Sequence, residues 1–223
     1  AILHAPLVQL MTSERKRLRD GPMKGQAGYG MQLASCTLWA PACTTALFKE
    51  AYLPAVTGGQ IGRFALFALS DKAEQDDQCA CIYNKSLLYL VSNAFEEKER
   101  IPLFRDGEAL LGMERFILAD PELKALFGSG QADLVIAPNT DPEGAPGASQ
   151  ARRHGDFDDD HHTVMATFAR IAAASAPGRH EAAHKVSRAA PLAPIDFHAS
   201  RSALRQRRQT IDDRTGGRPS CRT

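Results

Sequence analysis

The sequence lacks a long apolar segment and an excess of charge of either sign. No uninterrupted apolar run approaches the roughly 20 residues that a membrane-spanning helix needs. The 27 Lys and Arg residues are balanced by 26 Asp and Glu residues. No N-terminal stretch has the basic and then apolar order of a secretory signal. These absences predict a cytoplasmic globular protein that has no membrane partner.

The cysteines and glycines lack the spacings of common cofactor sites. The five cysteines, at positions 36, 43, 79, 81 and 221, are odd in number and include no Cys-x-x-Cys pair. This argues against a disulfide framework and against a zinc site, and it favours buried, reduced thiols. The glycines at positions 25, 28 and 30 do not have the spacing of a phosphate-binding loop, and no strand is predicted before them. No cofactor is therefore expected.

Apolar runs alternate with helical patterns along residues 1–175. Short, apolar, strand-like runs occur at 36–41, 62–69 and 132–137, and the second of these is apolar enough to be covered on both faces. Helical periodicity predicts helices over 1–11, 44–53, 78–97, 108–127 with a break before Pro121, and 158–174. This order predicts an α/β fold, with a partial parallel sheet flanked by helices, as a single domain over residues 1–175.

Residues 176–223 differ in composition from the rest of the chain. The segment has almost no apolar periodicity, and it contains nine arginines and one lysine against four acids. Such a segment cannot bury enough apolar surface to offset the entropy of ordering, so we expect a disordered basic tail. A basic tail can contact nucleic acid. This interpretation is the less favoured one because the segment lacks interleaved aromatic residues and any nucleic-acid-binding motif.

Titratable residues follow two of the predicted strands. A predicted loop after the strand at 62–69 begins with Ser70 and Asp71, with Glu74, Asp76 and Asp77 close behind, and His154 lies in the loop that follows the strand at 132–137. The carboxyl ends of parallel strands share one edge of a sheet, where functional groups gather. An acid after one strand and a histidine after the next is the order of the second half of a Ser-His-Asp relay. In such a relay the carboxylate orients the imidazole, which accepts the nucleophile's proton.

The stretch RRHGDFDDDHHT, residues 152–163, also allows a metal site. Asp156, Asp158, His161 and His162 are of the ligand types that divalent metals accept. Adjacent residues at the start of a helix point in diverging directions, however, and the positive end of the helix dipole favours acids at that place. The favoured interpretation is therefore the solvated N-terminus of a helix, with no metal bound.

Three segments resemble a known family. They are SCTLWAPACTTALFKEAYLPA, GRFALFALSDKAEQDDQCACIYNKSLLYLVSNAFE and HGDFDDDHHTVMATFARI. Together they are similar to the C-terminal portion of a bacterial group of α/β-hydrolase-fold serine hydrolases. The resemblance covers about residues 1–174 and is strongest over 36–96. It implies that Asp71 is the relay's acid, with Asp76 and Asp77 as alternatives, and that His154 is its histidine.

The resemblance also implies parts that residues 1–223 do not contain. The family's nucleophilic serine lies on a G-x-S-x-G turn before a buried helix that residues 1–11 resemble, so we expect it a few positions before Ala1. The first half of the sheet and the oxyanion-hole donors would lie outside the chain as well. The chain is therefore expected to be the second half of a hydrolase that cleaves an ester, amide or similar acyl bond, and to be inactive alone.

Two other functions stay open. A non-catalytic truncated or interaction protein could self-associate through an exposed apolar edge of the strand at 36–41, because unpaired strand edges promote association. A basic-tailed nucleic-acid binder is the less favoured alternative. Ser86 and Ser92 lie within the helix predicted over 78–97 rather than on a sharp turn, so neither is expected to be a nucleophile.

The composition of the tail generates a testable expectation. Backbone amides beyond residue 176 should exchange with solvent deuterium at rates close to those of an unfolded peptide, because little apolar surface is available to protect them. Hydrogen exchange followed by mass spectrometry measures this, with amides of residues 62–69 as the protected reference. Protection of the tail at the level of that strand would contradict the expectation.

Overall fold

The computed structural model describes residues 3–77, 86–92 and 107–175. The chain divides into two units, Ala1–Ala176 and Pro177–Thr223, and the predicted tail lies outside the described residues. In chain order the elements are α1 (His4–Thr12), β1 (Cys36–Trp39), α2 (Thr45–Ala51), α3 (Leu53–Thr57), β2 (Phe64–Leu69), α4 (Asp71–Asp76), α5 (Leu87–Leu90), α6 (Glu114–Ala119), α7 (Pro121–Gly128), β3 (Ala132–Ala137) and α8 (His161–Ser175). A short 3₁₀ turn, His154–Asp156, precedes α8.

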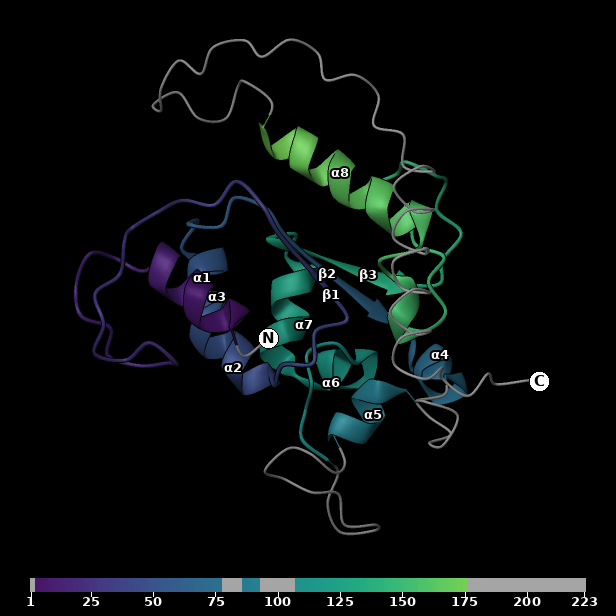
Figure 1. Cartoon of the computed structure of the whole chain (residues 1–223), viewed down its shortest axis with the longest axis horizontal. Helices are drawn as coiled ribbons and strands as arrows, with labels where there is room; N and C mark the ends of the chain where they lie inside the picture. The colour runs from purple at the N-terminus through teal and green to yellow at the C-terminus, as the bar shows by residue number, and fades with distance from the viewer. Residues whose placement is uncertain (1–2, 78–85, 93–106, 176–223) are drawn as a thin grey trace, which may run out of the picture. The chain divides into compact units, whose positions relative to one another are not determined.

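The three strands form one parallel sheet in the order β1-β2-β3 (Figure 1). β2 lies in the middle, where Phe64 pairs with Cys36 of β1 and with Ala132 of β3. The pairing of β2 with β3 continues to Leu69 and Ala137, so these two strands end together. The prediction of three parallel strands in an α/β arrangement is confirmed.

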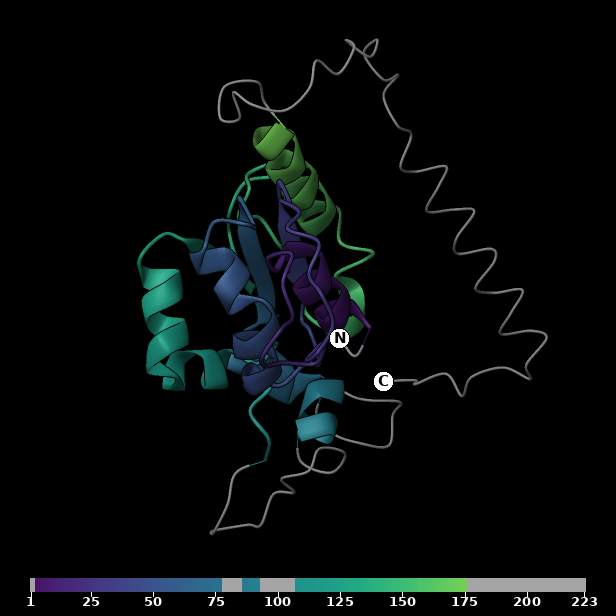
Figure 2. The same ribbon diagram turned by 90° about the vertical axis from the view of Figure 1, so that its left-hand side faces the viewer.

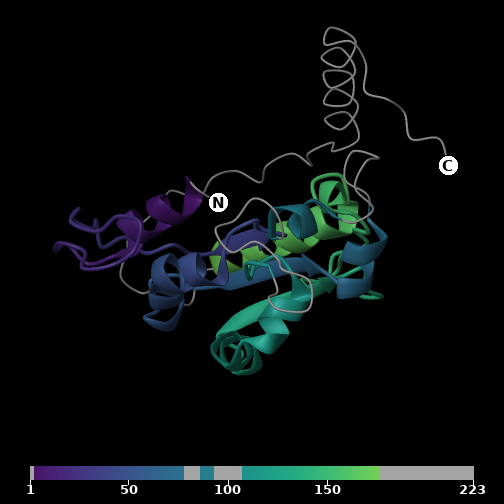
Figure 3. The same ribbon diagram turned by 90° about the horizontal axis from the view of Figure 1, so that it is seen from below.

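Both faces of β2 are covered, as its continuous apolar sequence predicts. Phe64 and Leu66 point into one apolar cluster, which includes residues of α1, α2, α3 and α7. Ala65 and Phe67 point into the other, which includes Ala166 of α8 together with residues of α5. Figures 2 and 3 show α7 and α8 on opposite sides of the sheet. Because successive side chains of β2 point to opposite faces of the sheet, this one strand packs against helices on both sides.

Local capping explains where two of the helices begin. Thr44 is extended, and its hydroxyl accepts a hydrogen bond from the amide of Leu47, which starts α2 at the predicted position. Asp120 caps α7 in the same way, by accepting from the amides of Glu122 and Leu123. Pro121 then occupies the first helical position, where no amide donor is needed. The predicted break between two helices before this proline is confirmed.

The predicted continuous helix over 78–97 is wrong at Ser86. This residue has an extended backbone and caps the short helix α5, and its hydroxyl accepts a hydrogen bond from the amide of Tyr89. The remainder of that prediction falls on residues 78–85 and 93–97, which lie outside the described residues. A second difference is α4, because Ser70 caps a helix where the sequence indicated a loop.

Two further sequence predictions concern the cysteines and the sheet edge. Cys36 and Cys43 are buried thiols, as predicted, and burial raises the pKa of Cys36 to about 11. Among the described residues no strand pairs with the outer side of β1. Trp39 of β1 is 36% exposed, and its indole donates to Thr167 of α8. Self-association through this edge stays a prediction.

In the part of the chain that the structure describes, no helix combines the length and the apolar character needed to cross a bilayer. The longest helix, α8, has 15 residues and carries Arg170 and several small side chains.

Replacement of a central leucine tests the two-sided packing of β2. Leu66→Ala should lower the free energy of unfolding by about 3 kcal/mol, because Leu66 is fully buried and its loss leaves a cavity. Leu118→Ala on α6 is the matched control, since Leu118 is 49% exposed and should change stability by no more than about 0.5 kcal/mol. Urea unfolding of both variants measures the difference, and equal losses would contradict the assigned core.

Candidate functional site

The site begins where β2 ends. The amide of Ser70 donates to the carbonyl of Ala137 at the end of β3, and the Ser70 hydroxyl then accepts from the amide of Ala73. This cap turns the chain directly into α4, so Asp71 occupies the first helical position and Asp77 follows the last. The two candidate acids therefore lie at opposite ends of one short helix beyond the carboxyl end of the sheet.

Asp71 is engaged by residues other than His154. Its Oδ1 accepts from the hydroxyl of Tyr89 at 2.8 Å, and its Oδ2 accepts from the side-chain amide of Gln75 at 2.6 Å. The backbone amide of Asp71 donates to Oε2 of Glu114 at 2.8 Å. Among the described residues, the Asp71 carboxylate thus holds α4 to α5 and makes no hydrogen bond with the candidate histidine.

Asp77 is the carboxylate that lies beside His154. Its Oδ2 accepts a hydrogen bond from the backbone amide of His154 at 3.0 Å, across 77 residues of sequence. Asp77 is only 7% exposed, whereas Asp76, the other alternative, is exposed. Of the three acids that the sequence left open, Asp77 is therefore the one that the structure brings to the histidine.

The imidazole of His154 does not use its full hydrogen-bonding capacity within the described residues. Its Nδ1 is buried and has no hydrogen-bond partner among the described residues. Burial lowers the pKa of His154 below its ordinary value of 6.5, and the negative charge of Asp77 partly opposes this effect. The imidazole is consequently neutral at pH 7 and can accept a proton.

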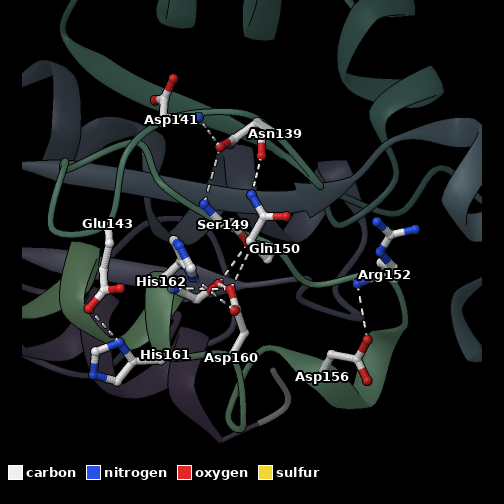
Figure 4. Close-up of polar contacts among 11 residues, drawn as sticks. Asn139, Asp141, Glu143, Ser149, Gln150, Arg152, Asp156, Asp160, His161 and His162 are labelled. Atoms are coloured by element: carbon white, nitrogen blue, oxygen red, sulfur yellow. Dashed lines mark hydrogen bonds and ion pairs between the residues drawn. The ribbon is translucent and has the colours of Figure 1, made fainter.

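A hydrogen-bonded loop connects the end of β3 to the turn that contains His154, and Figure 4 shows polar contacts of this loop. The side-chain amide of Asn139 donates to the carbonyls of Ile136 and Gly147, and its Oδ1 accepts from the amides of Asp141 and Ser149. Gln150 adds a side-chain hydrogen bond to the carbonyl of Asn139. The loop is therefore folded on a central asparagine, which explains how a long polar connection can place one histidine.

Two acids of the stretch at 152–163, Asp156 and Asp160, accept hydrogen bonds from nearby backbone amides (Figure 4). Oδ2 of Asp156 accepts from the amides of Arg152 and Arg153, which closes the turn that holds His154. Oδ2 of Asp160 accepts from the amides of Gln150 and Thr163, and the latter bond caps the start of α8. These carboxylates act as structural caps, in keeping with the predicted helix N-terminus.

The two histidines that follow have partners of their own. Nδ1 of His161 lies 3.1 Å from Glu143, and Nδ1 of His162 lies 3.7 Å from Asp160 (Figure 4). Within the described ranges, no group of three or more His, Cys, Asp or Glu residues is arranged to hold a metal ion. The metal-site alternative for this stretch therefore gains no support from the geometry.

Apolar packing anchors the turn that bears the histidine. Ala151 and Phe157, on either side of His154, are buried in the same cluster as Leu69 and Tyr89. Leu69 is the last residue of β2, and Tyr89 belongs to α5. The turn is therefore packed against the elements that carry Asp71 and its partners, although sequence separates them by more than sixty residues.

Glu74 and Ser86 are two buried polar residues that the sequence did not indicate as site residues. Both are fully buried, and the Ser86 hydroxyl donates to Oε2 of Glu74. Burial chiefly raises the pKa of Glu74 to about 7; the Ser86 hydrogen bond opposes this shift, and the neighbouring charges of Asp77 and Asp71 contribute to it. The spacing Asp71, Glu74, Asp77 was an available signal, because residues three apart share one face of a helix.

Arg115 is a further residue that the sequence did not indicate. Its guanidinium lies 5.0 Å from the ring centre of Tyr89 and 4.3 Å from that of Phe116, distances at which a cation is attracted to an aromatic face. Its Nε and one terminal nitrogen are buried without a hydrogen-bond partner among the described residues. Arg115 therefore adds a positive charge next to the tyrosine that holds Asp71.

No protein-family model, no curated protein and no solved structure matches the chain. What the site can do chemically must follow from its own geometry. That geometry places the half-buried His154, whose backbone amide donates to Asp77, beside the buried Asp77 carboxylate, beyond the ends of two neighbouring parallel strands.

The raised pKa of Glu74 predicts a pH dependence of stability. A group whose pKa is raised on folding contributes stability that is present below its unfolded pKa, near 4.5, and is lost as the pH rises through about 7. Glu74→Gln removes this titration. From pH 4.5 to pH 8 the stability of the wild type should therefore fall relative to Glu74→Gln by about 3 kcal/mol, as urea unfolding would measure. A difference that is the same at both pH values would contradict the assignment.

Proposed function

We propose that this chain supplies the histidine and the carboxylate of a Ser-His-Asp relay, with His154 as the general base and Asp77 as the acid that supports it. The observation that supports the proposal is the partly buried hydrogen bond from the backbone amide of His154 to the Asp77 carboxylate, beyond the carboxyl ends of neighbouring parallel strands. This is the place where α/β proteins gather their functional groups. Asp77 takes the role that the sequence first gave to Asp71, because Tyr89 and Gln75 already engage the Asp71 carboxylate.

The chemistry of the pair fits the role of a base. At pH 7 the imidazole of His154 is neutral and can take the proton of an attacking hydroxyl. The buried carboxylate of Asp77 then stabilises the imidazolium that forms. The proposed relay requires the Nδ1–H of His154 to donate to the Asp77 carboxylate. Nδ1 has no hydrogen-bond partner among the described residues, and catalytic hydrogen bonds are often long in the absence of substrate and tighten in the complex.

In this proposal the nucleophile would be a serine that lies outside residues 1–223, as the family resemblance implies. Ser86 and Ser92 are fully buried, and their hydroxyls donate to Glu74 and to the carbonyl of Glu108. Neither is available to attack a substrate. The parent protein would be an α/β-hydrolase whose serine precedes Ala1 and whose substrate contains an ester, amide or similar acyl bond. The chain alone would not turn over such substrates, and a cytoplasmic location stays a prediction.

The second candidate function is that of a non-catalytic interaction protein. The observation that favours it is the outer edge of β1, which pairs with no strand of the described residues, and the partly exposed Trp39 on that strand. An edge of this kind can pair with another chain through its backbone. Nucleic-acid binding depends on the basic tail alone, and that tail lies outside the described residues.

Activity of the parent protein tests the relay. We would assay p-nitrophenyl esters with the 223-residue chain and with the longer product of the same reading frame that includes a G-x-S-x-G turn. The longer product should be active, and Asp77→Asn should lower its kcat by on the order of 10³–10⁴, as expected for loss of the supporting carboxylate. Asp71→Asn is the matched control and should lower kcat by less than about 10-fold, because Asp71 contacts Tyr89 and Gln75 instead of His154.

Two results would contradict the proposal. One is an equal loss of kcat in Asp77→Asn and Asp71→Asn, which would remove the distinction between the two acids. The other is turnover by residues 1–223 alone that disappears in His154→Ala. That result would mean that the nucleophile lies within the chain.

A further inference from the structure

A buried polar pair connects α4 to α5 behind the proposed relay. The Ser86 hydroxyl donates to Oε2 of Glu74, and the backbone amide of Ser86 donates to the carbonyl of the same residue. The Ser86 hydroxyl also accepts from the amide of Tyr89 at the start of α5. Glu74 therefore accepts hydrogen bonds from both the side chain and the backbone of Ser86, the residue that caps the next helix.

Glu74 and Asp77 are linked through the last turn of α4. The amide of Glu74 donates to the carbonyl of Ser70, and the amide of Asp77 donates to the carbonyl of Ala73. Asp77 is the C-cap residue that follows α4, three residues after Glu74, and both are buried. A shift of Glu74 would consequently move Asp77, whose Oδ2 holds the amide of His154.

Filling space would not require a carboxyl group at position 74. A fully buried carboxyl with one oxygen, Oε1, that has no partner among the described residues is costly compared with an apolar side chain of similar size. The feature that an apolar side chain could not supply is a directed acceptor for the hydroxyl of Ser86. The hydrogen bond with Ser86, rather than the volume of the side chain, is therefore what a glutamate supplies at position 74.

We propose that Glu74 is a positioning residue, which acts through its buried hydrogen bond with Ser86 to hold the Asp77 carboxylate against His154. This inference rests on the proposed function, because it gives Asp77 and His154 the roles assigned above. Glu74 does not touch the imidazole or a substrate in this role. Its effect reaches His154 only through the placement of Asp77.

The charged groups around Glu74 allow the effect of geometry to be separated from the effect of charge. The carboxylates that act on Glu74 are Asp77 and Asp71, and both raise its pKa. Since its pKa is about 7, Glu74 is largely neutral in the range where His154 titrates, below pH 6.5. Glu74→Gln therefore keeps an acceptor oxygen and the relevant charge, whereas Glu74→Ala keeps the charge and removes the acceptor.

The pKa of His154 in the 223-residue chain is the quantity to measure. Diethyl pyrocarbonate modifies the neutral imidazole, so its rate of reaction with His154 as a function of pH, followed by peptide mass spectrometry, gives that pKa. Asp77→Asn gives the reference shift with which the other variants are compared, because loss of the neighbouring carboxylate should lower the pKa of His154 by about one unit. Glu74→Ala and Ser86→Ala should each reproduce at least about half of that shift, while Glu74→Gln should leave the pKa within about 0.3 unit of the wild type.

Asp76→Asn is the matched control for charge on α4, since Asp76 is exposed and solvent screens it, and it should leave the pKa of His154 unchanged. Circular dichroism verifies that each variant is folded. If Glu74→Ala fails to fold, Ser86→Ala and Glu74→Gln decide the question.

The positioning role is overturned if Asp77→Asn lowers the pKa of His154 while Ser86→Ala does not, or if Glu74→Gln lowers it as far as Asp77→Asn does. In either case the proposed function would stand. No shift in Asp77→Asn would overturn the positioning role and the His154–Asp77 pair together.

Discussion

The burial of β2 on both faces is the constraint on which the rest of the structure depends. A parallel strand without a solvent-facing side has no place for polar residues along its length, and all six residues of β2 are buried. Polar groups are therefore displaced to its carboxyl end, where Ser70 caps α4 directly after Leu69. Because β3 ends in register with β2, the connection after β3 begins at the same edge of the sheet.

The acidic stretch before α8 contributes to the site in a way that its charge does not suggest. Asp156 and Asp160 accept backbone amides, and these bonds fix the turn and the helix start on either side of Phe157. Carboxylates that satisfy otherwise unpaired amides at a helix start stabilise it through both hydrogen bonding and the helix dipole. The stretch thus supplies a rigid support for His154, and the carboxylate beside the histidine comes from α4 instead.

The strands, the helix that starts after Thr44 and the break before Pro121 could be predicted because each depends on residues close together in sequence. The choice between Asp71 and Asp77 could not be predicted in this way. It depends on Tyr89, a residue of another helix, whose hydroxyl donates a hydrogen bond to the Asp71 carboxylate. The interruption at Ser86 was missed for a similar reason. Helical periodicity continues through position 86, and only the tertiary contact with the buried Glu74 favours an extended backbone there.

Buried polar atoms without partners are expensive, and in the described part of the chain they are confined to three residues: Glu74, Arg115 and His154. These residues belong to α4, to α6 and to the turn before α8. Arg115 lies over the ring of Tyr89, which donates to Asp71, and the amide of His154 donates to Asp77. The charges of Asp77 and Asp71 act on Glu74. A structural core would spread such defects or remove them. Their concentration near the carboxyl ends of the strands is what the proposed relay would predict, because a ligand or partner that binds there could satisfy groups of this kind.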